Sequence, residues 1–158
     1  MPKYDRKGFT LIELLVVIAI IGILSTLAVV ALNTARQRSR DAKRVSDVRQ
    51  IQTALELGFS ETSTYPTATN IALGTADYDV LCNNGGVSEF RADAGPCTTI
   101  YMGLVPTSPT PNASTYNYSS ATGTAEYSLT FTLEGATGQL AAGDQCANQN
   151  GIQAGSSC

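Results

Sequence analysis

The stretch GFTLIELLVVIAIIGIL, residues 8–24, begins an apolar run that continues as far as Leu32. The only formal charge between Phe9 and Leu32 is the carboxylate of Glu13. A helix of these 24 residues would be about 36 Å long at about 1.5 Å per residue, which is enough to cross a bilayer. The run therefore predicts a membrane-spanning helix over residues 9–32.

Two more ordinary interpretations of the run are a secretory signal peptide and a plain single-span anchor. Lys3, Arg6 and Lys7 form a basic segment before the run, and small residues such as Ala28 and Ala31 lie near its end. The run is longer than the apolar region of a typical signal peptide, however, and an internal carboxylate fits such a region poorly. Length alone does not exclude a plain anchor, so the interpretations must be distinguished by the role of the Glu13 carboxylate.

The carboxylate of Glu13 needs a partner, because an ionised side chain inside hydrocarbon costs about 3 kcal/mol on insertion scales. No Lys, Arg or His occurs between Phe9 and Leu32. Cleavage after Gly8 would create a partner, a free α-amino group on Phe9 that is positively charged near neutral pH. Glu13 could fold back toward the amine of its own chain. The amine of a neighbouring copy would instead satisfy both charges across a subunit interface, and Glu13 would then direct assembly.

This N-terminal pattern resembles that of a known protein family. A short basic leader ending in Gly8, followed by FTLIE and an apolar helix, is similar to the class III signal of type IV pilins and the related pseudopilins. The resemblance is closest over residues 6–32. It implies that prepilin peptidase cuts between Gly8 and Phe9, that Phe9 is N-methylated, and that Glu13 guides docking onto a growing filament. Some tip subunits of such filaments lack the glutamate, so its presence favours a subunit within the filament body.

A second helical pattern follows the apolar run without an interrupting glycine or proline until Gly58. Apolar residues recur every three or four positions, as they do along one helix face: Ala42, Val45, Val48, Ile51, Leu55 and Phe59. An amphipathic helix is therefore predicted over residues 33–60, continuous with the apolar one.

Charged residues of this second helix mostly avoid the apolar stripe. Lys43, Arg44 and Asp47 are accordingly expected to lie on its exposed side. A group of cations at its beginning, Arg36, Arg38 and Arg40, is expected either to be solvated or to contact lipid head groups or the acidic heads of neighbouring subunits.

Residues 61–158 are rich in Thr, Ser, Gly and Asn and are expected to form a globular head. Residues 125–134 alternate between apolar and polar side chains, which is typical of a strand with one buried face. Residues 114–120 are expected to be its partner strand and residues 138–142 a short third strand, whereas three prolines make residues 104–111 an extended connector. Together these elements predict an α+β fold, in which the second half of a long N-terminal helix packs on a small antiparallel sheet.

The head contains all four cysteines: Cys82, Cys97, Cys146 and Cys158. Their even number and wide spacing indicate disulfide bonds, and so a head that folds outside the cytoplasm. Of the three connectivities, we favour pairing of neighbours, Cys82 with Cys97 and Cys146 with Cys158; unpaired core thiols are the alternative.

Orientation in the membrane has two opposing indicators. Three Lys or Arg precede the span and five follow it closely, and a simple positive-inside count would place the head in the cytoplasm. The family resemblance and the cysteines indicate the opposite, and long domains translocate largely regardless of their charge. We therefore expect a single-pass precursor in the inner membrane with its head outside the cytoplasm, and then an extracellular filament.

Charge and composition weigh against other functions. Residues 1–50 hold nine Lys or Arg and four Asp or Glu, whereas residues 51–158 hold only Arg91 against nine acids. Nucleic-acid binding is therefore unlikely for the head, which would repel phosphate. The chain has no histidine, and no constellation for catalysis or for a metal is visible. Secretion pseudopilins often bind calcium in the head, so calcium binding is kept as an alternative for this chain. No EF-hand spacing is present in the sequence, however.

The sequence thus predicts a non-enzymatic structural subunit of a type IV pilus, processed after Gly8 and polymerised through its N-terminal helix. The alternative is a pseudopilin of a type II secretion or DNA-uptake system. The expected partners are further copies of the chain, prepilin peptidase, the assembly machinery in the inner membrane, and the membrane itself before assembly.

Overall fold

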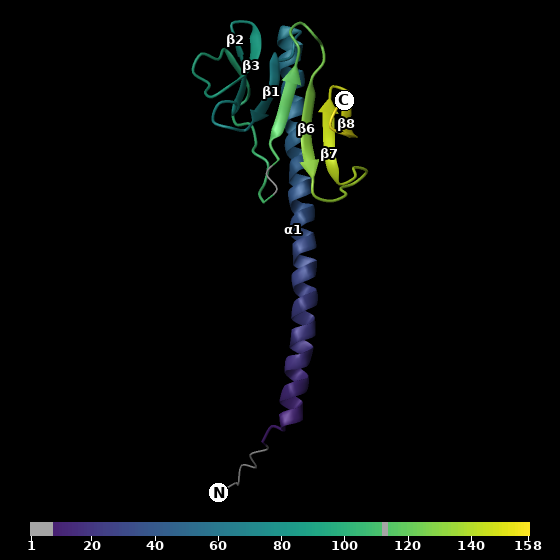
Figure 1. The fold of residues 1–158 in the computed structure, drawn as a ribbon. Helices are drawn as coiled ribbons and strands as arrows, with labels where there is room; N and C mark the ends of the chain where they lie inside the picture. The colour runs from purple at the N-terminus through teal and green to yellow at the C-terminus, as the bar shows by residue number, and fades with distance from the viewer. Residues whose placement is uncertain (1–7, 112–113) are drawn as a thin grey trace. The chain divides into compact units, whose positions relative to one another are not determined.

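The computed structural model describes residues 8–111 and 114–158. The predicted leader, residues 1–8, lies almost entirely outside the described residues. The chain divides into two compact units, Met1–Arg36 (unit 1) and Gln37–Cys158 (unit 2). One helix, α1, spans Leu11–Thr62 and contributes to both units (Figure 1).

Unit 1 contains the apolar part of α1. An 18-residue window of this helix has a mean hydropathy of 3.0, and none of it is buried. By length and composition it is able to cross a membrane. The helix was predicted to begin at Phe9, but it begins at Leu11. The reason is that Thr10 is its N-cap residue, and an N-cap has a non-helical backbone.

Unit 2 contains the rest of α1 and eight strands (Figure 1). Along the chain these are β1 Ala68–Leu73, β2 Val80–Asn84, β3 Val87–Arg91, β4 Thr99–Met102, β5 Tyr116–Ser120, β6 Ser128–Leu133, β7 Gly143–Asn148 and β8 Gly151–Ala154. They form two antiparallel sheets, one ordered β1-β5-β6-β7-β8 and the other β3-β2-β4. The α+β fold class predicted from the sequence is confirmed.

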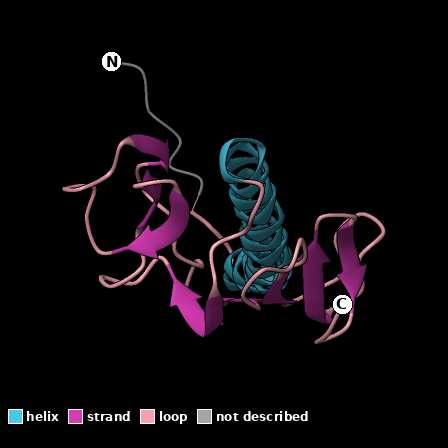
Figure 2. Cartoon of the chain, turned by 90° about the horizontal axis from the view of Figure 1, so that it is seen from above, coloured by secondary structure: helices cyan, strands magenta, loops and turns pink. Residues whose placement is uncertain are grey.

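The core of unit 2 lies between α1 and the larger sheet. Seen along the helix, strands lie on both sides of it (Figure 2). β5 and β6 pair with Tyr118 opposite Leu129, so their alternating apolar residues share the face that packs on the helix. The helix supplies Val48, Ile51 and Leu55, all fully buried. The predicted strand pair and the predicted apolar stripe therefore meet, and each covers the other.

Two details of the predicted stripe are wrong. Ala42 is exposed, whereas Arg44 and Asp47, which were expected on the exposed side, are 0% and 5% exposed. Arg44 is buried because it has polar partners from two other segments of the head, and a buried charge is tolerated when it is paired and hydrogen-bonded.

The third predicted strand is also misplaced. Residues 138–142 contain only a single bridge between Thr137 and Leu140, and the strand beside β6 is β7, Gly143–Asn148. Gly138 has a φ of +63°, so the chain turns where a strand was expected. β7 lacks clear alternation because three consecutive residues in it, including Cys146, are buried.

Both disulfides lie in unit 2. Cys82 in β2 pairs with Cys97 in the loop before β4, and Cys146 in β7 pairs with Cys158 after β8. This is the pairing of neighbours favoured from the sequence, and no cysteine is free.

Candidate functional site

The backbone around Gly8 and Phe9 lies outside the helix. Phe9 is 87% exposed, and a side chain added at Gly8 would meet nothing within 4 Å. An exposed, non-helical backbone is the form in which a peptidase reaches a peptide bond. The predicted cleavage bond is therefore accessible in this structure.

Glu13 belongs to a capping box at the start of α1. The backbone N–H of Thr10 donates to Glu13 Oε2 at 2.8 Å, and the Thr10 hydroxyl donates to the same oxygen at 2.7 Å. In return, the Glu13 N–H donates to Thr10 Oγ1 at 3.3 Å. The carboxylate thus satisfies the N–H of Thr10, and the Thr10 hydroxyl satisfies the N–H of Glu13, which the first turn would otherwise leave unpaired. The carboxylate also stands at the positive end of the helix dipole.

This contact gives the carboxylate a partner within its own chain. The capping box was not predicted from the sequence, where only a cation was expected as the partner of Glu13, although the spacing Thr10-x-x-Glu13 is its known signature. Both donors use Oε2, so Oε1 makes no hydrogen bond within the described residues. One copy can therefore hold the carboxylate in place and still offer an oxygen to a second donor.

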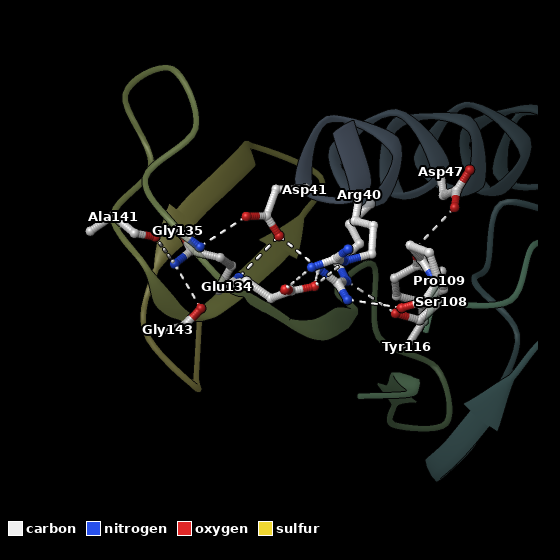
Figure 3. Close-up of polar contacts among 12 residues, drawn as sticks. Arg40, Asp41, Asp47, Ser108, Pro109, Tyr116, Glu134, Gly135, Ala141 and Gly143 are labelled. Atoms are coloured by element: carbon white, nitrogen blue, oxygen red, sulfur yellow. Dashed lines mark hydrogen bonds and ion pairs between the residues drawn. The ribbon is translucent and has the colours of Figure 1, made fainter. Parts of the chain in front are cut away.

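A buried ionic cluster in unit 2 links α1 to two distant segments (Figure 3). Arg44 is fully buried and donates to Asp41 Oδ1 at 2.7 Å and Glu134 Oε1 at 2.8 Å. It also donates to the backbone carbonyl of Pro109 at 2.9 Å and to the hydroxyl of Ser108 at 3.2 Å. The connector that contains Ser108 and Pro109 and the end of β6 are thereby both attached to the helix.

Arg40 and Asp41 complete this cluster. Arg40 forms a two-bond pair with Glu134, at 2.8 and 2.5 Å. Asp41 accepts the backbone N–H groups of Glu134 and Gly135 at 3.0 and 2.9 Å. We call Arg40, Asp41, Arg44 and Glu134 the ionic latch. Arg40 was expected from the sequence to be solvated or to contact lipid head groups or neighbouring heads. Its guanidinium group instead pairs with Glu134 of the same chain.

The latch shifts the pKa values of two of its members, Glu134 and Arg40. Hydrogen bonds from Arg40, and then from Arg44, lower the pKa of Glu134 to about 2. The hydrogen bond to Glu134 in turn raises the pKa of Arg40. Both shifts favour the charged forms, so the Arg40–Glu134 pair stays ionised over the physiological pH range.

A second buried acid of α1 lies close to the latch (Figure 3). Asp47 accepts a hydrogen bond from the Tyr116 hydroxyl at 3.0 Å, and burial raises the pKa of Asp47. Among the described residues there is no group of three or more His, Cys, Asp or Glu that could hold a metal ion. The latch and the Asp47–Tyr116 pair both join α1 to distant segments of the head.

Comparison with known proteins bears on the N-terminal segment. A family profile described as "Prokaryotic N-terminal methylation motif" matches residues 3–29. The chain carries an N-terminal methylation motif. Gly8, Phe9 and Glu13 all lie within the matched segment.

The relatives that match part of this chain include both a secretion protein and fimbrial proteins. It is 39% identical to "Type II secretion system core protein G" of Aeromonas hydrophila over 67 residues, 42% of this chain and 47% of that protein. It is 35% identical to a "Fimbrial protein" of Pseudomonas aeruginosa over 85 residues, 51% of this chain and 55% of that protein. A third relative, "Type IV major fimbrial protein FimA" of Dichelobacter nodosus, is 45% identical over 54 residues, 34% of this chain and 35% of that protein.

The chain spans about half the length of the curated relatives that it matches. No solved structure matches it. The likeness to pilins and pseudopilins is thus a finding about part of the chain, and it does not choose between the two branches.

Proposed function

We propose that this chain is a structural subunit of a type IV pilus, cut after Gly8 and polymerised through its N-terminal helix. The observation that carries the proposal is the apolar part of α1, which is exposed on every side although it starts with a carboxylate. An apolar helix of this kind needs either lipid or other helices around it.

The exposed apolar surface of unit 1 is too large to remain in water. Its large apolar side chains from Leu11 to Leu32 are all between 47% and 81% exposed. Burying one such side chain fully is worth about 1.5–3 kcal/mol relative to water. Before assembly the lipid would cover these side chains, and in the filament the equivalent helices of neighbouring subunits would do so.

Glu13 would set the position of each incoming helix. In a single copy, Thr10 already holds Glu13 Oε2, which orients the carboxylate. Cleavage after Gly8 would leave a charged amine on Phe9, and the amine of a neighbouring subunit is the counter-ion that the hydrocarbon environment demands. The capping box and the intersubunit ion pair are compatible because they can use different carboxylate oxygens.

The cleavage step has a direct test. Replacing Gly8 by a bulky residue such as Leu is expected to leave the precursor uncut by prepilin peptidase, because the proposed recognition requires a small residue there. Intact mass of the purified subunit reads the result. Normal removal of residues 1–8 from this variant would contradict the proposed processing site.

The assembly step has a separate test. Glu13→Ala is expected to insert into the membrane and to be cleaved, yet to form no filaments, because the amine of the next subunit loses its counter-ion. Glu13→Asp serves as the matched control that keeps the charge. Abundant filaments from the alanine variant would overturn the pairing of amine and carboxylate.

A pseudopilin of a type II secretion system is the second candidate, because relatives of that class match over the N-terminal part of this chain. We favour the pilus because of the disulfide between Cys146 and Cys158, which closes a loop near the C-terminal end of the head. A deletion strain separates the two: loss of surface fibres indicates a pilus, whereas loss of secretion with fibres intact indicates a pseudopilus.

Partners and location follow from the same proposal. The precursor would cross the inner membrane once with its head outside the cytoplasm, be processed there by prepilin peptidase, and be added to the filament by the assembly machinery. The chain itself would catalyse no reaction in this role.

A further inference from the structure

We propose that a groove along α1 in unit 2 binds a second copy of this chain. The second copy would insert its Leu104, together with the acidic loop beside that residue, into the groove. This inference rests on the filament proposed above and deepens it, because it names the surfaces through which heads of successive subunits meet.

The groove lies beside the part of α1 that belongs to unit 2. It has a volume of about 630 Å³ and is lined by the side chains of Ala42, Val45, Arg49, Gln52, Leu140 and Ile152. A second hollow of about 420 Å³ shares Arg49 and Gln52 and extends to Glu56. Positions three and four apart lie on one helix face, so these α1 residues form a single stripe, which the exposed Arg38 prolongs.

The walls of the groove hold groups that lack a partner among the residues that the structure describes. Arg49 is exposed and forms no ion pair among the described residues. Thr137 Oγ1 is buried and has no hydrogen-bond partner in the described part of the chain. Val45, Leu140 and Ile152 are only partly buried against the core. The groove therefore offers an apolar floor next to a cation.

Charge is divided unevenly over the exposed surface of unit 2. Among its described residues the exposed cations all lie on α1, at Arg38, Lys43 and Arg49. Exposed acids follow them along the chain: Glu56 and Glu61 lie at the end of α1, and Asp77, Asp93, Glu126 and Asp144 lie beyond it. A basic stripe and an acidic head on the same molecule complement each other across a contact between two copies.

One acidic surface also carries an apolar side chain that fits the floor of the groove. Leu104 is 74% exposed, more than any other large apolar residue described in unit 2. The N–H of Val105 donates to the carbonyl of Asp79 at 2.6 Å, which places Leu104 beside the loop that contains Asp77. Asp77 is exposed, and Asp79 Oδ1 is buried without a hydrogen-bond partner within the described residues. We call Asp77, Asp79 and Leu104 the acidic knob.

The groove and the acidic knob are different surfaces of one chain. A contact between them is therefore heterologous, with each copy using its knob on one neighbour and its groove on the other. A heterologous contact that does not close into a ring produces an open helical array. The proposed contact thus has the symmetry that a filament requires, and it places Leu104 over Val45 and Asp77 near Arg49.

Charge reversal tests this contact in the full-length chain, in a host that assembles it. Arg49→Glu is expected to lower the yield of sheared filaments about tenfold or more, because a carboxylate would then face the acidic knob. Adding Asp77→Arg to that variant reverses the pair and should restore the yield. Lys43→Glu, which changes an exposed cation off the stripe, is the matched control and should leave the yield unchanged.

Cross-linking tests the same contact without charge reversal. A chain with Arg49→Cys and Asp77→Cys is expected to form disulfide-linked chains upon oxidation of intact filaments, whereas Lys43→Cys with Asp77→Cys is not. Amounts of each variant in the membrane, with the Cys146–Cys158 disulfide intact, show that the head has folded. If a charge variant fails to accumulate, the cross-link alone decides.

The outcomes separate this inference from the proposed function. Absence of filaments from the unaltered chain would refute the filament itself. Normal filaments from Arg49→Glu, failure of Asp77→Arg to restore them, or absence of the Arg49–Asp77 cross-link from intact filaments would overturn only the groove-and-knob contact.

Discussion

Arg44 and Glu134 form an ion pair of 2.8 Å although 90 residues separate them in the chain. Arg44 is fully buried, and four residues outside the apolar core set its position: Asp41, Ser108, Pro109 and Glu134. The latch therefore attaches the helix, the connector after β4 and the end of β6 to one guanidinium group. Its role in stability can be measured directly.

Replacing Arg44 by Met is expected to lower the free energy of unfolding of the head by about 3–5 kcal/mol, because two carboxylates would then be left close together without their central cation. Thermal or denaturant unfolding of the full chain in detergent, followed by the near-ultraviolet signal of the buried tyrosines, measures the change. Lys43→Met removes an exposed cation from the neighbouring position and should alter stability by less than about 0.5 kcal/mol. Equal effects of the two substitutions would show that the latch is not a stabilising element.

Stability should depend on the ionisation of Glu134. The folded-state pKa of about 2 is below the ordinary value of 4.5, so Glu134 contributes stability above pH 4.5 that is lost as the pH falls toward 2. Measuring the free energy of unfolding between pH 6 and pH 2 should show this loss, superimposed on that of other acids. Glu134→Gln should reduce the slope over the same interval. An unchanged slope in that variant would contradict the assigned pKa.

The capping box predicts a local effect at the start of α1. Thr10→Val removes the hydroxyl that donates to Glu13 and accepts its N–H, and loss of such a cap costs about 0.5–2 kcal/mol. Faster amide hydrogen exchange is therefore expected over residues 11–14 in detergent micelles, with no change in unit 2. Thr10→Ser keeps the hydroxyl and should behave like the unaltered chain. Equal exchange in the valine variant would argue against the cap.

The disulfide between Cys146 and Cys158 closes a short loop. Replacing both cysteines by Ser is expected to destabilise the head by about 2–4 kcal/mol, because the unfolded chain regains the freedom that the closed loop denied it. The same replacement of Cys82 and Cys97 is the matched comparison, since its loop is of similar length. Unfolding midpoints under non-reducing conditions give the values. A change below about 0.5 kcal/mol would show that the C-terminal disulfide serves something other than stability.

Several elements of the head could be predicted because their signals are local. The alternation in residues 125–134 indicated β6, and the tyrosines of residues 114–120 indicated β5. β1, β2, β4 and β8 gave no such signal, because their exposed and buried residues do not alternate clearly. In β3 the burial does alternate, but Ser88 is buried and Val87 exposed, so its hydrophobicity does not follow the burial. β7 was misplaced for the same reason, since both of its faces are partly covered.

The burial of charged residues in α1 could not be predicted from helical periodicity. Arg40, Arg44 and Asp47 look like ordinary surface residues when only helical periodicity is considered. Their partners, Glu134 and Tyr116, lie 69 to 94 residues away, and no spacing rule connects them. By contrast, the whole signature of the capping box, Thr10-x-x-Glu13, lies within four consecutive residues.

The sequence by itself determined the apolar helix, its single carboxylate and the capping signature, because hydrophobicity, helical period and capping act between residues a few positions apart. Only the tertiary structure decided which charges of α1 are buried and which remain exposed. That choice depends on long-range partners, because a guanidinium group can leave water only where folding brings acids and carbonyl groups to meet it.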